Sequence, residues 1–320
     1  MANPGIPVLT AEQTTSLLNQ HDVLSALRHV FIRLAEEKAV QPDQQLVLLP
    51  EGRGDFINYF GADLHEGVLG VKISPYLVTG KKPIITAWTL LLSTTTGQPV
   101  LLCDASRLTT ERTAATTVLA VEQLAPARAS ILTVVGTGPV AKAHIRYAAS
   151  LRNWHEIRVV SRSNHITVGQ LSEETGVDSA RLALYPSVEL AVTGADVVML
   201  CTSSATPVIQ PDWLTHPCLV TSISTNAMRA HEIPPEALSD MDVYCDYRAT
   251  TPAQAGEMVI AESDYGWQRS AIRGDLPELV TGRCEKPDYQ RHVFFRSLGL
   301  GIEDIAIAAL IQTCWQNKDN

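Results

Sequence analysis

The segment that most constrains the fold is residues 131–145, which read ILTVVGTGPVAKAHI. An apolar, β-branched run ends in Gly136-Thr137-Gly138, and a helix-like segment begins at once. With Ala141, the two glycines fit the pattern G-x-G-x-x-A between a strand and a helix, which is typical of a dinucleotide-binding turn. The first glycine permits the tight turn, the second lets the backbone approach a pyrophosphate, and the alanine allows close helix–strand packing. The sequence therefore predicts a dinucleotide site at this turn.

The surroundings of the turn have the pattern of a parallel sheet. The runs that read as buried strands are ILTVVG, EIRVVS, ADVVML and CLVTSIS, and helical segments separate them. This alternation predicts crossover helices and a doubly wound domain from about residue 126 to about 250. Pro139 suits the first helical turn, where the N–H groups and the helix dipole would face phosphates.

The first hundred residues have a different pattern. Residues 10–38 have apolar positions at helical spacing after a threonine, which predicts one helix. Two apolar runs around a Thr-rich turn, IITAWTLLLSTTTGQPVLLCD, predict a hairpin. The shorter expected strands are 45–50, 56–60 and 68–73.

Two more helices complete the predicted fold. Residues 109–125 are Ala-rich, and Thr109 or Thr110 would cap the helix. A last apolar helix follows a glycine-containing turn in FFRSLGLGIEDIAIAALIQTCW. The predicted fold class is α/β, with a doubly wound Rossmann domain and an α+β domain for substrate binding and dimerisation.

Composition excludes several functional classes. The 320 residues are 45% hydrophobic and 18% charged, and the net charge of -9 argues against a nucleic-acid surface. We expect no signal peptide, because the N-terminal residues MANPGIPVLTAEQ lack a basic segment followed by an apolar one. We expect no membrane span, because the longest apolar runs are far shorter than roughly 20 residues. The six cysteines form no Cys-x-x-Cys pair, so we expect reduced cysteines, a cytoplasmic protein and no metal site.

The end of the second strand bears on the choice of cofactor. An acid at this place favours NAD, but the sequence has Ser161, Arg162 and Ser163. Arg162 could face the 2′-phosphate of NADPH, with hydroxyls beside it. The alternative is a solvated surface arginine. We predict NADPH as the preferred cofactor, with NADH as the other possibility.

Two cationic residues outside the glycine turn are candidates for the site. Lys72 lies in the apolar strand VLGVKISPY, where lysine is rarely buried without a partner. The alternative is a strand-edge lysine whose ammonium group reaches water. Arg112 lies near the start of a helix with small neighbours and could clamp a carboxylate. Its alternative is an exposed arginine paired with Glu111 or with solvent.

Five segments together resemble the ornithine cyclodeaminase/μ-crystallin family, and the likeness runs nearly end to end. They are GVKIS, TTERTAA, VVGTGPVAKAH, VSRS and FFRSLGLGIEDIAIAALI. The resemblance implies a substrate and dimerisation domain of residues 1–112 with 295–320, and a Rossmann domain of residues 113–294. It implies a homodimer formed through the first domain's sheet, and an active site in the cleft between the domains.

The resemblance also assigns roles to residues. Lys72 would contact the carboxylate or imine region of a small imino acid, and Arg112 would bind its carboxylate. The expected catalytic set is Lys72, Arg112 and Asn226, with Gln44 as a further substrate-binding residue. The expected cofactor-binding residues are Gly136, Thr137, Gly138, Pro139, Val140, Ser161, Arg162, Ser163, Thr202, Ser224, Ser297 and Leu298.

Three positions depart from the family pattern. Gln44 stands where a second arginine for the substrate carboxylate is usual, and it carries no charge. Asn226 aligns with the acid of the cyclodeaminases, and an amide cannot act as a carboxylate base. Val140 replaces a frequent glutamine of the glycine turn.

These departures favour imine reduction over cyclodeamination, which needs an acid–base group near the α-amino nitrogen. We predict an NAD(P)H-dependent ketimine reductase acting on a cyclic imino acid. Δ1-Pyrroline-2-carboxylate or Δ1-piperideine-2-carboxylate would give L-proline or L-pipecolate. The alternatives are an ornithine cyclodeaminase, an alanine-dehydrogenase-like enzyme, and a non-catalytic protein that binds NADPH and a small ligand.

Overall fold

A computed structural model describes residues 5–161, 166–224 and 229–318. The chain forms two compact units. The first unit comprises Met1–Arg112 and Leu300–Asn320, and the second comprises Thr113–Gly299. The predicted fold class, a Rossmann domain with an α+β domain, is confirmed.

The first unit is built on a mostly antiparallel sheet in the order β1-β8-β7-β5-β4-β2, with β3 beside β4 and β6 beside β5. Among the described strands of this unit, only β1 and β8 pair in parallel. The predicted hairpin is present as β7 and β8. The strand bounds are β1 Val8–Leu9, β2 Ala39–Val40, β3 Gln45–Leu48, β4 Gly54–Asp63, β5 Val68–Leu77, β6 Ile84–Ile85, β7 Trp88–Ser93 and β8 Pro99–Asp104.

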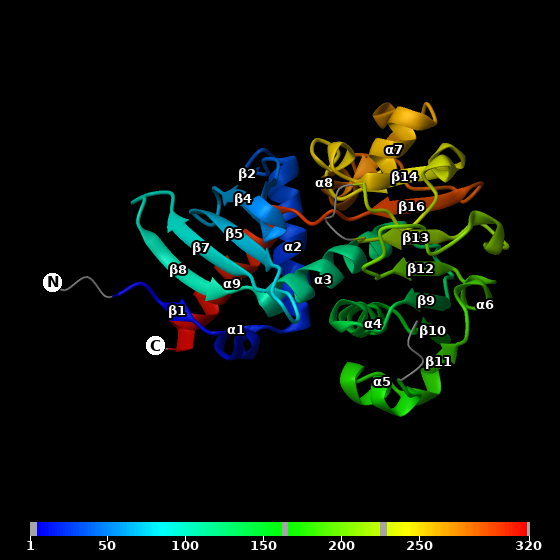
Figure 1. Cartoon of the computed structure of the whole chain (residues 1–320), viewed down its shortest axis with the longest axis horizontal. Coiled ribbons are helices and arrows are strands. Elements are labelled where there is room, and N and C mark those ends of the chain that lie inside the picture. Colours follow the sequence, from blue (N-terminus) through cyan, green and yellow to red (C-terminus); the bar gives the residue numbers. More distant parts are fainter. Residues whose placement is uncertain (1–4, 162–165, 225–228, 319–320) are drawn as a thin grey trace. The chain divides into compact units, whose positions relative to one another are not determined.

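Helix α9 (Gly301–Lys318) contacts β4, β5 and β7 and returns the end of the chain to this unit (Figure 1). The single helix predicted over 10–38 is wrong, because two helices, α1 (Ala11–Leu17) and α2 (Gln20–Ala35), occupy this stretch. Between them Leu18 is extended, and the Asn19 side chain caps α2 by accepting a hydrogen bond from the backbone of Asp22.

Helix α3 (Ser106–Leu124) begins earlier than predicted. The backbone N–H of Ser106 donates to Asp104 Oδ1 at 2.9 Å. This contact satisfies a donor at the start of the helix. The expected caps, Thr109 and Thr110, therefore lie inside the helix. Its first residues, through Arg112, belong to the first unit.

The second unit contains an all-parallel sheet in the order β11-β10-β9-β12-β13-β16-β14-β15 (Figure 1). The strand bounds are β9 Ile131–Val135, β10 Glu156–Val160, β11 Leu182–Tyr185, β12 Val197–Leu200, β13 Leu219–Ser222, β14 Met241–Cys245, β15 Ile272–Asp275 and β16 His292–Arg296. The helix bounds are α4 Pro139–Leu151, α5 Val168–Thr175, α6 Val188–Val192, α7 Gly256–Asp264 and α8 Leu276–Thr281.

The strand order places β9 between β10 and β12. The chain moves outward from β9 to β11 and then returns to continue on the other side, so β9 marks the topological switch point where dinucleotides bind. Strand β16 pairs with β13 and β14. The second unit consequently extends to Gly299 rather than to residue 294, where we had placed the boundary.

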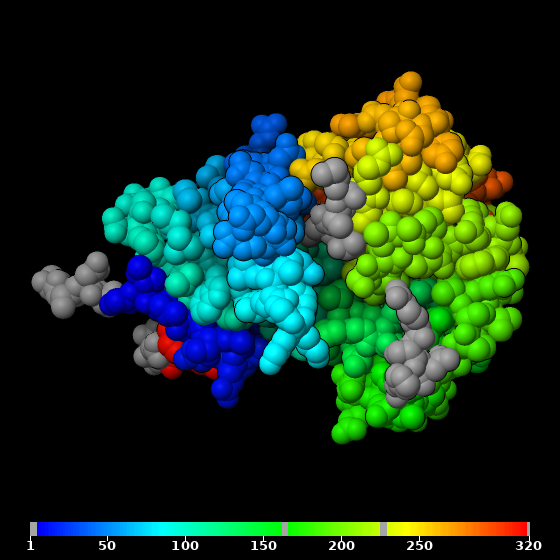
Figure 2. Space-filling model, in the orientation of Figure 1, coloured from blue at the N-terminus to red at the C-terminus, as the bar shows by residue number. Residues whose placement is uncertain are grey.

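Within the described ranges, none of the helices combines the length and the apolar character that a membrane span requires. Several large apolar side chains of the first unit are exposed to solvent. Leu48 is 69% exposed, and Ile84 and Ile85 are 50% and 69% exposed. Figure 2 shows the neighbouring β5–β6 connection, in cyan, at the surface of this unit.

Candidate functional site

The glycine turn after β9 requires a glycine at its first position. Gly136 has φ +129°, and a Cβ atom there would lie 2.5 Å from the carbonyl oxygen of Cys201. The Gly136 N–H donates to the carbonyl of Val160, at the end of β10, at 2.9 Å. This backbone conformation and this close approach exclude other residues, as predicted for the first glycine of the turn.

The start of α4 is arranged to receive an anion. Gly138 is the N-cap residue and offers no side chain to the helix N–H groups, while Pro139 occupies the first helical turn. A Cβ atom on Gly138 would meet no heavy atom within 4 Å, so the absence of a side chain leaves open space at the helix end. Free N–H groups beside open space fit a pyrophosphate.

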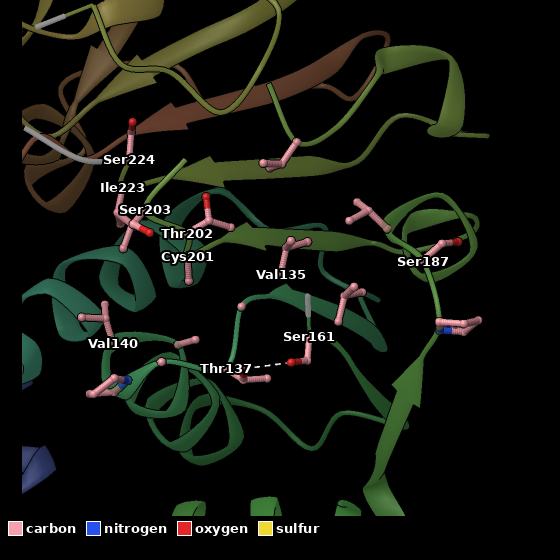
Figure 3. A pocket seen from close by; sticks show the side chains of 18 residues that line it. Val135, Thr137, Val140, Ser161, Ser187, Cys201, Thr202, Ser203, Ile223 and Ser224 are labelled. Atoms are coloured by element: carbon pink, nitrogen blue, oxygen red, sulfur yellow. Dashed lines mark hydrogen bonds between the residues drawn. The ribbon is translucent and has the colours of Figure 1, made fainter. Parts of the chain in front are cut away.

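A pocket of about 850 Å³ adjoins this helix end in the second unit (Figure 3). It includes residues at the carboxyl ends of β9, β10, β12 and β13. Thr137 and Ser161 come from neighbouring strand ends, and their hydroxyl oxygens lie 3.2 Å apart. The predicted cofactor residues that line the pocket are Gly136, Thr137, Gly138, Pro139, Val140, Ser161, Thr202 and Ser224.

Other predicted cofactor residues lie elsewhere. Ser297 and Leu298 follow β16 and are not among the residues that line the pocket. The Leu298 N–H donates to Asp246 at 2.6 Å, which holds this turn inside the second unit. Arg162, Ser163 and the predicted catalytic Asn226 lie outside the described residues.

Sequence reasoning missed part of the pocket. Pro186, Ser187 and Val188 line it just after β11. The third strand of the sheet ends there, beside the second, so its carboxyl end could have been included from topology alone. The strand LALY is only four residues long and lies at the edge of the sheet, and the sequence analysis did not identify it as a strand.

A second group of candidate residues forms a buried charge cluster in the first unit. Lys72, on β5, is 1% exposed, so the alternative of a lysine reaching water is wrong. Its Nζ lies 2.8 Å from Asp304 Oδ2 and donates to the Thr109 hydroxyl at 3.3 Å. The same ammonium group lies 4.1 Å from the ring centre of Tyr59, its register partner on β4.

Arg112 belongs to the same cluster. It is 4% exposed, and its Nε and Nη1 donate to Asp304 Oδ1 and Glu303 Oε2, each at 3.1 Å. Glu111 pairs instead with Arg107. The alternative of an exposed Arg112 paired with Glu111 is therefore wrong. Both acids lie in the segment SLGLGIED, and the sequence analysis did not pair them with the two cations.

Close packing of α9 against β4 explains why these acids reach the cluster. A Cβ atom on Gly301 would lie 2.1 Å from the carbonyl oxygen of Phe60, so only glycine fits at the first residue of the helix. Glu303 and Asp304 follow within the first turn and are almost fully buried. Acids in the first helical turn also interact favourably with the helix dipole.

Burial and neighbouring charges give the two cations different proton affinities. Burial lowers the pKa of Lys72 to about 8, although the charge of Asp304 opposes this shift. For Arg112, burial alone would lower the pKa, but Asp304 and Glu303 outweigh burial and raise it. Arg112 is thus a permanent cation, whereas Lys72 can gain and lose a proton near neutral pH.

Gln44 immediately precedes β3 in the first unit. Its Oε1 atom is buried, and among the described residues it has no hydrogen-bond partner. A buried acceptor without a donor is costly. The position is therefore suited to a ligand that carries a donor.

Comparison with known proteins shows the family to which the chain is related. The model of the ornithine cyclodeaminase/mu-crystallin family matches residues 7–319. The chain belongs to this family. The NAD(P)H-dependent anabolic L-arginine dehydrogenase of Pseudomonas aeruginosa is 54% identical over 301 residues, which cover 94% of this chain and 95% of the relative. The ketimine reductase mu-crystallin of Rattus norvegicus is 25% identical over 73% of this chain and 71% of its own length.

A solved structure extends the family comparison to the fold. The Δ1-pyrroline-2-carboxylate reductase of Thermococcus litoralis, in complex with NADH and L-proline, matches with a TM-score of 0.89. The match covers 98% of each chain at 21% sequence identity, so it establishes a shared fold. For the chain described here, the predicted enzyme class and cofactor, an oxidoreductase that uses NAD(P)H, are confirmed by the family and by the 54% identical relative.

Proposed function

We propose that this chain uses NAD(P)H to reduce the C=N bond of a 2-imino acid to an L-amino acid, and that its principal product is L-arginine. The 54% identity to an L-arginine dehydrogenase over nearly the whole of both chains carries the choice of product. The reacting imine would form from ammonia and the 2-oxo acid that has the guanidino side chain of arginine. The cofactor supplies the hydride to Cα.

The charge cluster supports this chemistry because it offers two preorganised cations to a substrate carboxylate. An ammonium group has three donors and a guanidinium has five. The named contacts use two donors of Lys72 and the Nε and Nη1 atoms of Arg112. We propose that the Nη2 edge of Arg112 binds the carboxylate. Lys72 would contact the carboxylate or imine region and could donate a proton to the imine nitrogen as the hydride arrives at Cα.

Asp55 lies on the same face of the sheet as Tyr59, and its negative charge favours a substrate with a cationic side chain. Asp55, Ile57 and Tyr59 alternate along β4, so their side chains share one face, and Tyr59 lies opposite Lys72. Asp55 is half-buried. Its Cα lies about 13 Å along the strand from that of Tyr59. We propose that Asp55 binds the guanidinium group of the substrate.

Cyclic ketimines are the second candidate, as the sequence analysis predicted. They are supported by the likeness to a ketimine reductase and by the neutral residues Gln44 and Asn226, which imine reduction tolerates. Cyclodeamination of ornithine lacks this support, because Asn226 cannot act as a base.

The test compares substrates at fixed enzyme and cofactor concentration. NADPH and NADH oxidation would be followed with ammonia plus 2-oxo-5-guanidinopentanoate, with ammonia plus pyruvate, and with the two cyclic imino acids. We expect the largest kcat/KM for the guanidino acid, and L-arginine as the product by chiral chromatography.

Other outcomes would contradict the proposal in distinguishable ways. A larger kcat/KM for Δ1-pyrroline-2-carboxylate or Δ1-piperideine-2-carboxylate would favour the cyclic candidate. Efficient ammonia release from L-ornithine with catalytic NAD would indicate a cyclodeaminase. Tight NADPH binding without turnover of any of these compounds would indicate a binding protein.

We also propose that the protein is a homodimer formed through the sheet of the first unit. The support is the exposed apolar surface around Leu48, Ile84 and Ile85, which needs a cover. Light scattering should give the mass of two chains, and a monomer at micromolar concentration would contradict this proposal. The cytoplasmic location stays a prediction.

A further inference from the structure

Glu232 is a buried carboxylate that the sequence analysis did not single out. It is 0% exposed and lies in the second unit. Its Oε1 accepts hydrogen bonds from the backbone N–H and the hydroxyl of Thr202, at 2.8 and 2.7 Å. Its Oε2 accepts from the Ser222 hydroxyl at 2.7 Å and from the Ser224 N–H at 2.9 Å. Four donors therefore converge on one side chain.

These donors belong to the ends of two neighbouring strands. Thr202 follows β12, and Ser222 and Ser224 lie at or just after the end of β13, which pairs with β12 in parallel. Thr202 and Ser224 both line the cofactor pocket, where Figure 3 shows them with Ser203 and Ile223. Glu232 is not itself among the lining residues, but it binds two residues that are.

Ser224 has an unusual backbone conformation at its contact with Glu232. Its φ is +40°, in the left-handed region that a non-glycine residue rarely adopts. The hydrogen bond from its N–H to Glu232 helps to hold it there. Its hydroxyl oxygen is buried and has no hydrogen-bond partner among the described residues, so it is available to a ligand.

A buried cation lies close to the carboxylate. Arg296, on β16, is the register partner of Ser222, and its Nη1 donates to the Ser222 hydroxyl at 3.4 Å. Ser222 therefore stands between the Arg296 guanidinium and Glu232. The arrangement links the ends of three adjacent parallel strands, β12, β13 and β16, at the edge where a dinucleotide binds.

We infer that Glu232 is a positioning residue for the nicotinamide half of the cofactor. The adenosine half belongs to β9, β10 and β11, and the other half of a doubly wound sheet receives the nicotinamide. Glu232 holds Thr202 and Ser224 in that half. Only a carboxylate accepts two donors on each oxygen, because an amide nitrogen donates rather than accepts.

The experiment separates the two halves of the cofactor. Binding of NADH and NADPH to the full chain would be measured by calorimetry, alongside ADP-ribose and its 2′-phosphate, which lack nicotinamide. For Glu232→Gln we expect both reduced cofactors to bind about tenfold more weakly, as for the loss of a hydrogen bond to a charged group. The two fragments should bind within about twofold of the wild-type affinity.

The matched control is Asp196→Asn. Asp196 is also a carboxylate that accepts backbone N–H groups, from Ser130 and Ile131, but it does so at the start of β9, at the opposite edge of the sheet. It should leave the ratio of cofactor to fragment affinity unchanged. Ser222→Ala removes one donor and keeps the carboxylate, and it should give a smaller loss of the same selective kind.

Equal losses for cofactors and fragments in both Glu232→Gln and Ser222→Ala would overturn the inference and leave Glu232 with a purely structural role. Unchanged binding of the cofactors would overturn it as well. If Glu232→Gln does not fold, the selectivity of Ser222→Ala decides. No substrate is used, so the outcome is independent of the proposed imine.

Discussion

Lys72 and Arg112 are held by the same carboxylate, that of Asp304. The Lys72 Nζ lies 2.8 Å from Oδ2 and the Arg112 Nε lies 3.1 Å from Oδ1, and all three side chains are 5% exposed or less. Asp304 keeps two like charges close together that would otherwise repel each other. The cluster is therefore in place before any substrate arrives, which lowers the cost of ordering it on binding.

The lowered pKa of Lys72 predicts a specific pH dependence. Burial lowers this pKa to about 8, so the ammonium form dominates below that pH and the neutral amine dominates above it. Imine reduction needs the charged form, because the ammonium group binds the carboxylate and can donate a proton to the imine nitrogen. The kcat/KM of reduction should fall about tenfold per pH unit above pH 8.

The variant Lys72→Met separates this ionisation from those of ammonia and the imine. It should reduce turnover and lose the inflection near pH 8, while inflections that belong to the substrate persist. Retention of the same inflection in the variant would show that another group causes it.

Arg112→Ala should damage turnover more than it damages cofactor binding. Loss of one partner of a buried charge pair costs on the order of 2–5 kcal/mol, which would appear in kcat/KM for the imine. Arg107→Ala is the control, because Arg107 lies on the same helix and its side chain is 44% exposed. Thermal melting would verify that both variants fold. A folded Arg112→Ala variant with the wild-type kcat/KM would show that Arg112 does not bind the substrate.

Much of the fold could be predicted from the sequence because its signals are local. The β-branched runs, Gly136 and Pro139 predict a strand, a turn and a helix within one short segment. The break between α1 and α2 was not predicted, because the apolar spacing continues across it. There the cap formed by Asn19 determines where the second helix begins.

The candidate site was harder to predict because its contacts join distant parts of the chain. Lys72 and Arg112 stood out as unusual residues, but their partner Asp304 lies 192 positions after Arg112 and still farther from Lys72. Glu232 could not be recognised from the sequence for a different reason. Two of its four donors are backbone N–H groups, and these cannot be inferred from the type of residue that carries them.

Arg162→Ala should weaken NADPH binding and leave NADH binding nearly unchanged. The reason is the sequence Ser161-Arg162-Ser163 after β10, where an acid would select NAD. Calorimetry with both cofactors provides the test. Equal losses of affinity for the two cofactors would show that Arg162 does not recognise the 2′-phosphate.

His144 should make the stability of the protein depend on pH. Its ring nitrogens contact the Val140 carbonyl and the Thr117 hydroxyl, and burial lowers its pKa from 6.5 to about 4. Above pH 6.5 both the folded and unfolded states are neutral at this ring. As the pH falls from 6.5 to 4, the unfolded state gains a proton first, so the free energy of unfolding falls by up to about 3 kcal/mol.

Urea unfolding at several pH values between 7 and 4 would measure this loss. His144→Asn should be less stable at pH 7 but should lose less stability on acidification. His21→Asn is the control, because the His21 side chain is 92% exposed. An unchanged slope in the His144 variant would assign the pH dependence to other groups.

Asp55→Asn should change substrate preference rather than general activity. If Asp55 binds the guanidinium group, its loss should lower kcat/KM for the guanidino imine about tenfold, as for a hydrogen bond to a charged partner. Reduction of the imine of pyruvate, whose side chain is a methyl group, should stay at the wild-type level because Arg112 and Lys72 still bind the carboxylate. Glu51→Gln is the control, since Glu51 precedes β4 and its side chain is 83% exposed. A proportional loss for both imines would mean that Asp55 supports the sheet and not the substrate, and no loss for either would leave the recognition of the side chain to other residues.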